Sequence, residues 1–96
     1  MIRSFGDSLS EDLFNDRQSS ATRKFPADLR RVAQRKLQYL NAAAKLHDLA
    51  VPPGNRLEAL KGSLRGLHSI RINDQWRIVF KWEEGGPSEV KIVDYH

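Results

Sequence analysis

The spacing of apolar residues predicts two helices in the first half of the chain. Residues 7–14 gather apolar side chains on one helical face, which Asp7 or Ser8 can cap. Pro26 suits the first turn of a second helix, which is expected to end near residues 46–49. Residues 15–20 are expected to form a loop, and prolines at positions 52 and 53 break the pattern. The stripe of the second helix consists of Leu29, Val32, Ala33, Leu37, Leu40 and Ala44.

The second half of the chain alternates between apolar and polar residues, which predicts β-strands. A short strand ends at Lys61-Gly62, longer strands cover residues 68–73, 76–82 and 90–95, and a weak edge strand covers residues 1–5. A tight turn at 73–75 and a hairpin loop at 83–88 join the longer strands. With 96 residues the chain has room for one domain, residues 1–96. The predicted fold is α+β, with an N-terminal helical pair packed on a small antiparallel β-sheet.

Alternation assigns the two faces of this sheet. The large apolar residues point toward the helices, namely Ile70, Ile72, Trp76, Ile78, Phe80 and Trp82. The opposite face carries four cations on adjacent strands, namely Arg71, Arg77, Lys81 and Lys91. Cations this close repel one another unless an anion binds them, which favours a phosphate-binding surface. The alternative is that long Lys and Arg stems merely cover the solvated face of the sheet.

Composition narrows the function classes. The net charge of +4 is consistent with a nucleic-acid partner, or simply with solubility. The basic side chains Arg30, Arg31, Arg35 and Lys36 lie on the second helix, away from its apolar stripe. The absence of cysteine excludes disulfides and thiolate metal sites. No apolar stretch resembles a membrane span or signal peptide, so we expect a mature, soluble, cytoplasmic protein.

The chain ends in an acid, a phenol and an imidazole, Asp94-Tyr95-His96. Cleaving an RNA phosphodiester without a metal requires a base, an acid and fixed positive charge. The triplet can supply the base and the acid. Arg77 and Arg71 can supply the fixed positive charge, and Lys61 is a further phosphate ligand. The alternative is that Asp94, Tyr95 and His96 are each an ordinary residue at the protein surface. A regular strand would place Asp94 and His96 on the face opposite Tyr95, so the triplet converges only if the chain bends after Val93.

Neither a metal nor a cofactor is expected. The histidines at positions 47, 68 and 96 are far apart in sequence, and no ligand pair has the spacing of a metal site. The two consecutive glycines at 85 and 86 lie in the expected hairpin and do not form a phosphate-binding loop.

Four segments together resemble the HigB (host inhibition of growth) toxins of the RelE superfamily. They are residues 1–5, Leu57-Glu58-Ala59-Leu60-Lys61-Gly62, residues 69–80 with the core Asn73-Asp74-Gln75-Trp76-Arg77, and residues 92–96. The resemblance implies a RelE-like fold and a bacterial type II toxin that cuts mRNA in the ribosomal A site. It also implies silencing by a cognate antitoxin, commonly a helix-turn-helix protein.

By matching position, the resemblance makes Arg77 the phosphate-stabilising residue and Lys61 a ligand near the scissile phosphate. It makes Asp94, Tyr95 and His96 the catalytic cluster. Glu58 stands where some members have a histidine, so either Glu58 transfers a proton or Asp94 and His96 carry more of that role. A basic residue of some members falls on Asn73 here, and Arg71 is offered as its substitute. Ribosomal RNA would then contact the second helix through Arg30, Arg31, Arg35 and Lys36.

Two other function classes remain open at this level. One is a non-catalytic RNA- or ribosome-binding module. The other is an inactive toxin relative that acts through its antitoxin, as a corepressor on operator DNA.

Overall fold

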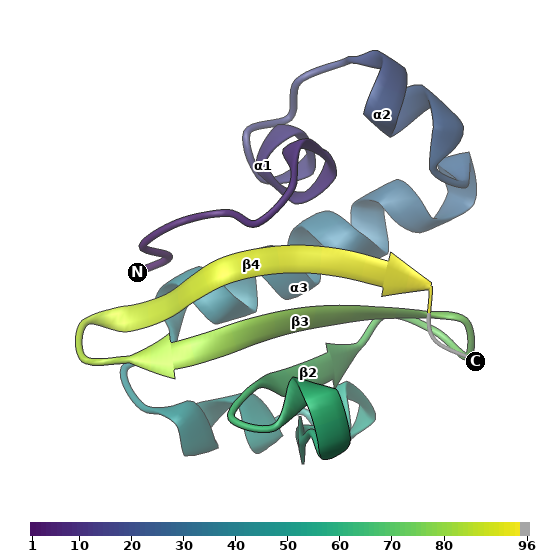
Figure 1. The fold of residues 1–96 in the computed structure, drawn as a ribbon. Helices are drawn as coiled ribbons and strands as arrows, with labels where there is room; N and C mark the ends of the chain where they lie inside the picture. Colours follow the sequence, from purple (N-terminus) through teal and green to yellow (C-terminus); the bar gives the residue numbers. More distant parts are fainter. Residues whose placement is uncertain (95–96) are drawn as a thin grey trace.

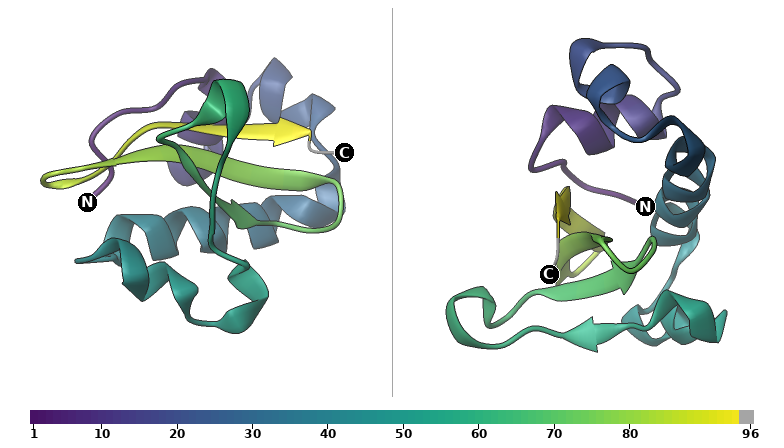
Figure 2. Two further views of the ribbon diagram at one scale, coloured as in Figure 1. Left: turned by 60° about the horizontal axis from the view of Figure 1, so that its bottom comes forward. Right: turned by 90° about the vertical axis from the view of Figure 1, so that its right-hand side faces the viewer.

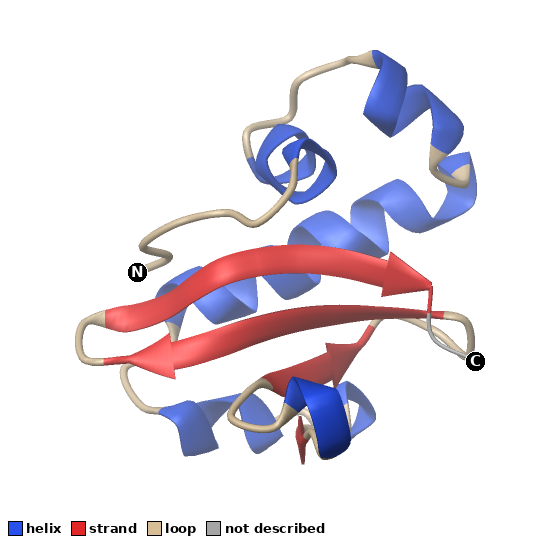
Figure 3. Ribbon diagram, in the orientation of Figure 1, coloured by secondary structure: helices blue, strands red, loops and turns tan. Residues whose placement is uncertain are grey.

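The computed structural model describes residues 1–94, which form a four-stranded antiparallel sheet with the longest helix across one face (Figures 1 and 3). The α-helices are α1 (Ser8–Phe14), α2 (Ser20–Lys24) and α3 (Arg30–Ala42). The strands are β1 (Glu58–Ala59), β2 (His68–Arg71), β3 (Trp76–Glu83) and β4 (Gly86–Asp94), in the spatial order β1-β2-β3-β4. Short 3₁₀ turns occupy Ala27–Leu29, Leu46–Ala50, Pro53–Asn55 and Gly62–Leu64, labelled η1 to η4. The α+β fold class predicted from the sequence is confirmed.

The first helix is joined to the sheet through its cap. Asp7 Oδ1 accepts a 2.9 Å hydrogen bond from the Ser10 amide, as an N-cap does. Asp7 Oδ2 also accepts from the Ile92 amide at 3.1 Å, and the buried Ser10 hydroxyl donates to the Val90 carbonyl at 2.8 Å. The cap, expected at Asp7 or Ser8, is Asp7, and it also attaches α1 to β4.

The second expected helix, α3, is shorter than its apolar pattern indicated. It ends at Ala42 instead of residues 46–49, because Asp48 begins a separate turn: its Oδ2 accepts from the Ala44 and Lys45 amides, both at 3.0 Å. Another departure is α2, which begins at Ser20, the last residue of the expected loop, and continues through residues for which no element was predicted. A reciprocal capping box between Ser19 and Thr22 stabilises that short helix despite its lack of an apolar stripe.

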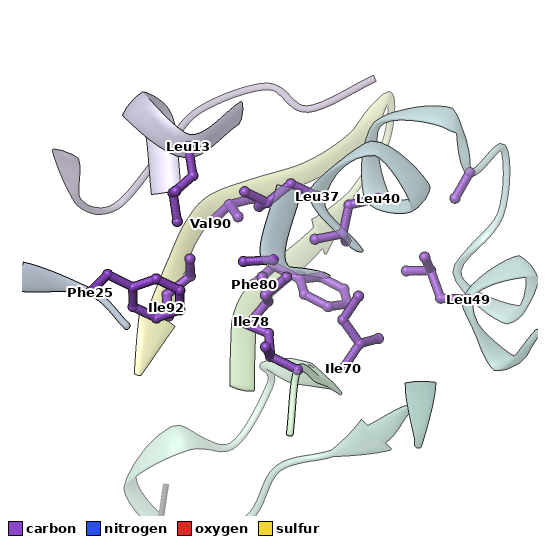
Figure 4. Packing of buried hydrophobic residues seen from close by; sticks show 13 residues of the cluster. Leu13, Phe25, Leu37, Leu40, Leu49, Ile70, Ile78, Phe80, Val90 and Ile92 are labelled. Carbon is purple, nitrogen blue, oxygen red and sulfur yellow. The ribbon is translucent and has the colours of Figure 1, made fainter. Parts of the chain in front are cut away.

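The hydrophobic core lies between α3 and the sheet. Ile70 pairs with Ile78 and Ile78 with Ile92, so three strands present isoleucine to the helix at one level (Figure 4). Leu37 and Leu40 of α3 are fully buried against this surface. The predicted core face of the sheet is confirmed.

The β3–β4 hairpin is tighter than the sequence suggested. β4 begins at Gly86, so the loop expected over 83–88 shrinks to Glu84 and Gly85. The register shifts between Val79 and Lys81 in β3, opposite Glu89, whose φ of +52° marks a β-bulge in β4. Val90 and Ile92 both face the core, as alternation predicts, but the bulge places Ser88 opposite Lys81 on the other face, which a strict two-residue alternation cannot predict.

The N-terminal segment runs beside β4 without forming a regular strand. Phe5 makes an isolated parallel bridge with Val90, and Arg3 donates its amide to Pro87. The weak edge strand predicted over 1–5 is thus reduced to a few hydrogen bonds. Across residues 1–94 no helix is both long and apolar enough to cross a bilayer.

Candidate active site

The candidate site lies on the face of the sheet that is turned away from α3, called the open face here. Arg71 and Arg77 are direct cross-strand partners on β2 and β3, and Arg77 is in turn opposite Val93 on β4. Ser69, Val79 and Lys91 form the next row along the sheet. The segment containing η4 lies in front of this face, on the side opposite α3 (Figure 2). The shared face predicted for Arg71 and Arg77 follows directly from this register.

Arg77 is buried and held by several partners. Only 7% of the surface of Arg77 is exposed, and its Nε donates a 2.8 Å hydrogen bond to Ser69 Oγ. Its Nη2 donates to the carbonyl of Arg56 at 2.7 Å, and its Nη1 lies 3.4 Å from Glu58 Oε1. A guanidinium held in this way offers positive charge in a fixed direction, which electrostatic stabilisation of a transition state requires.

Backbone geometry at Arg56 contributes to this arrangement. Arg56 has φ +46° and ψ +57°, a left-handed conformation that ends η3 and directs the chain into β1. The same segment supplies the carbonyl that Arg77 binds. The sequence contains no signal for this contact, because a backbone carbonyl is present at every position. Ser69 could have been found, since alternation places it on the face of Arg71 and Arg77.

The depth of Arg77 has a structural cause. Val79 is buried on the open face and Leu60 in the segment beyond β1, and neither belongs to the main core cluster. The loop from Leu60 to Leu67 is closed by a 2.9 Å hydrogen bond between the Leu60 amide and the Leu67 carbonyl. This loop lies on the side of the sheet opposite α3 (Figure 2), and Lys61 at its start is exposed.

The open face carries more negative charge than the alternation pattern suggested. Arg71 forms an ion pair with Asp74, Arg77 with Glu58, and Lys81 with Glu83 at 3.8 Å. The face is therefore largely compensated, and is not a bare cluster of cations. Glu83, two residues after Lys81, could have been predicted from alternation, whereas Asp74 comes from the turn and Glu58 from the edge strand.

The carboxylate of Glu83 is held by more than its ion pair. The Ser88 hydroxyl donates to Glu83 Oε1 at 2.6 Å, and this hydrogen bond is the main cause that lowers the pKa of Glu83. The charges of Lys81 and Arg3 act in the same direction, while partial desolvation opposes them. The ionised form of Glu83 is thus favoured in the folded protein.

Lys36 is not an exposed cation of α3, contrary to the prediction. The residue is 7% exposed, and its Nζ donates a 2.5 Å hydrogen bond to Oδ1 of the fully buried Asn55. Burial lowers the pKa of Lys36, and the charges of Arg35 and Arg71 lower it further. Asn55 in turn donates hydrogen bonds from its Nδ2 to the carbonyls of Leu49 and Val51. The reason for the error is geometric: Lys36 points toward the η2–η3 segment, which covers a face of α3 that the apolar stripe did not mark.

The remaining α3 cations are divided. Arg31 and Arg35 are exposed, as expected for residues that contact a large anionic partner. Arg30 is half-buried, and its Nε is shielded from solvent beside α1 and α2.

Asp94 lies at the end of a regular strand. It pairs with Trp76, as Val93 pairs with Arg77, so the register places Asp94 beside Trp76 and not beside Arg77. Gln75 Nε2 donates to Asp94 Oδ2 at 3.1 Å, which ties the strand end to the turn before β3. β4 stays paired with β3 through Asp94. Tyr95 and His96, the other predicted members of the cluster, lie outside the described residues.

Comparisons with known proteins identify the family. The family model described as the RelE-like toxin of the type II toxin–antitoxin system HigB matches residues 3–96. The chain belongs to the HigB family of RelE-like toxins.

Individual relatives agree with this assignment. The HigB-family chain is 40% identical to "Toxin HigB-1" of Vibrio cholerae over 85 residues, which cover 88% of this chain and 87% of the relative. It is also 40% identical over 60 residues to an uncharacterised protein of Haemophilus influenzae, covering 62% of this chain and 59% of that protein.

A solved structure shows the same fold at low sequence identity. A chain of the YoeB–YefM complex from Staphylococcus aureus matches all of this HigB-family chain with a TM-score of 0.61, covering 98% of its own length. The identity is 14%, so the likeness is one of fold alone.

Proposed function

We propose that this HigB-family toxin is a ribosome-dependent mRNA endonuclease that cuts in the A site. The observation that carries the proposal is Arg77, a buried guanidinium fixed on the open face by Ser69, Arg56 and Glu58. The proposal is also supported by the match to a family of toxins, and the terminal residues Asp94, Tyr95 and His96 have side chains that can transfer protons.

The proposed reaction needs no metal. A base removes the proton of a ribose 2′-hydroxyl, whose oxygen attacks the adjacent phosphorus. The bond to the 5′-oxygen of the next nucleotide breaks, leaving a 2′,3′-cyclic phosphate, and an acid protonates the departing oxygen. Arg77 stabilises the negative charge that develops on the phosphate oxygens. Proton transfer is assigned to the terminal cluster of Asp94, Tyr95 and His96.

Other cations would contribute to the affinity for RNA and not to the cleavage step. Arg31 and Arg35 are exposed on α3 and are assigned to ribosomal RNA phosphates, with Arg30 at the edge of that surface. The open face adds candidate RNA ligands at its rim, namely Lys61, Arg71, Lys81 and Lys91. Lys36 is left out of this set because it is buried.

The proposed partners follow from the family. A type II toxin is paired with an antitoxin, and the structural neighbour is itself a chain of a complex, YoeB–YefM. We therefore assign this toxin a cognate antitoxin of the helix-turn-helix type and a place in the bacterial cytoplasm, where ribosomes are found. No cofactor enters the proposal.

The test compares the wild type, Arg77→Ala and a truncation lacking His96 in a bacterial host. Mapping mRNA 5′ ends on purified ribosomes should show new ends for the wild type and a loss of at least a hundredfold for both variants. A wild type that binds ribosomes but produces no new ends would overturn the enzymatic proposal in favour of a non-catalytic binding module.

A further inference from the structure

Glu58 is a half-exposed anionic partner of the buried guanidinium of Arg77. The carboxylate lies 3.4 Å from Nη1, and its side chain is 50% exposed while that of Arg77 is 8% exposed. The Nε and Nη2 atoms of the same guanidinium bind Ser69 and the Arg56 carbonyl. Of these three partners Glu58 is the anion, so a phosphate that binds Arg77 must share the guanidinium with the Glu58 carboxylate or replace it.

A carboxylate and a phosphodiester are competing ligands for a guanidinium. Both present anionic oxygens at similar spacing, and both accept charge-assisted hydrogen bonds from Arg. If a phosphate bound Arg77 with Glu58 still ionised and in place, two anions would share one cation at short range. Each phosphate must therefore displace the carboxylate or bind against its repulsion.

Displacement is easy for a ligand that has other contacts and hard for one that does not. Within residues 1–94, Arg77 is the one side chain that the Glu58 carboxylate contacts at ion-pair distance. A half-exposed ion pair of this kind is weak enough to be exchanged. Messenger RNA held on the ribosome is positioned by many additional interactions, whereas free RNA has only the toxin itself.

We propose, on the basis of the function proposed above, that Glu58 is a specificity-determining residue that competes with phosphate at Arg77. Its carboxylate weakens the binding of free RNA and so confines cleavage to mRNA positioned by the ribosome. This role differs from proton transfer, because it makes Glu58 an obstacle to binding and not a participant in the bond-breaking step.

The chain offers a matched control for charge. Glu84→Gln removes the same charge as Glu58→Gln, from an exposed position in the β3–β4 hairpin. Seven residues of extended chain separate position 84 from Arg77, which is roughly 20 Å. Any effect of net charge alone appears equally in both variants.

The experiment measures binding of a short fluorescent RNA whose ribose at the scissile position is 2′-deoxy, so that cleavage cannot occur. Glu58→Gln is expected to bind about fivefold more tightly than the wild type, and Glu84→Gln to stay within about twofold. The ratio of cleavage of unmodified free RNA to cleavage on ribosomes should rise by about the same factor, and Glu84→Gln should leave that ratio unchanged.

Two results would overturn the inference. Glu58→Gln could bind the probe no more tightly than Glu84→Gln, or it could lose cleavage on both substrates at unchanged affinity, which would make Glu58 a proton-transfer group. The binding measurement does not depend on catalysis. A wild type that fails to cut mRNA on ribosomes therefore refutes the proposed function, while the comparison of RNA affinity between Glu58→Gln and Glu84→Gln still tests the role of Glu58. A gain in affinity is also a result that simple loss of structure cannot produce.

Discussion

The Nε of Arg77 donates a 2.8 Å hydrogen bond to the hydroxyl of Ser69, its neighbour on β2, and both residues are buried on the open face. The same hydroxyl lies in the row of Val79 and Lys91, so the orientation of Arg77 is tied to the register of three strands. A small polar residue thereby links sheet pairing to the proposed chemistry.

Replacing Ser69 with alanine should remove this support. A buried Nε–H loses its acceptor, which costs about 1–2 kcal/mol of unfolding free energy. Cleavage on ribosomes should fall about tenfold, because Arg77 is no longer held in one direction. Urea unfolding and single-turnover cleavage measure the two effects.

Ser88→Ala is the matched control for Ser69→Ala. Ser88 is also buried on the open face, but its hydroxyl binds Glu83 and not Arg77. Cleavage should stay within about twofold of the wild type in this variant. Equal losses of cleavage in the two variants would show that Ser69 acts through general stability and not through Arg77.

Adjacent cations of α3 should behave differently because one is buried and the other is not. Arg35→Gln removes an exposed charge and should lower the dependence of ribosome affinity on salt by about one phosphate contact. Lys36→Met should leave that dependence unchanged, because Lys36 is bound to Asn55 in the interior.

Lys36→Met should instead destabilise the fold. The Oδ1 of Asn55 loses its donor in a buried place, which costs about 1–3 kcal/mol. Chemical unfolding measures this cost, and ribosome binding across a salt series measures the first effect. A reduced salt dependence in Lys36→Met would contradict the buried position of its ammonium group.

The low pKa of Glu83 predicts a pH-dependent contribution to stability. The Ser88 hydrogen bond, with Lys81 and Arg3, lowers this pKa below its ordinary 4.5 in the folded state. The stabilisation is therefore fully present above pH 4.5 and is lost as the pH falls through the folded-state pKa. The difference in unfolding free energy between wild type and Glu83→Gln should shrink between pH 7 and pH 3. A difference that stays constant across this range would refute the assignment.

The two ends of the Gln75–Asp94 hydrogen bond can be separated by mutation. Gln75→Ala removes the 3.1 Å contact that ties the end of β4 to the turn, and should reduce cleavage only about threefold. Asp94→Asn keeps a side chain of the same size but removes the charge and the basicity. Cleavage should fall about a hundredfold or more in this variant if Asp94 transfers a proton as proposed. Similar small losses in both variants would make Asp94 a structural tie at the strand end.

Local patterns determined most of the architecture. The helical spacing around Leu37 and Leu40 and the alternation from Ile70 to Phe80 each follow from burying one face of an element, and both predictions are confirmed. The cap at Asp7 was equally predictable, because capping depends on a few consecutive residues. The common face of Arg71 and Arg77 likewise follows from the two-residue period of a strand.

Only the tertiary structure decided which charged groups meet. Lys36 is buried because a segment nineteen residues downstream carries Asn55 against it, and Arg77 is held by the carbonyl of Arg56 and by Glu58 from the edge strand. The bulge at Glu89 changes which residues face Lys81, and no alternation rule contains it. Hydrophobic periodicity reports whether a side chain is turned inward or outward, whereas ion pairs and hydrogen bonds depend on contacts between distant segments. The sequence thus determined the sheet and the face on which Arg77 lies, and the fold determined that this arginine is buried, oriented and faced by a carboxylate.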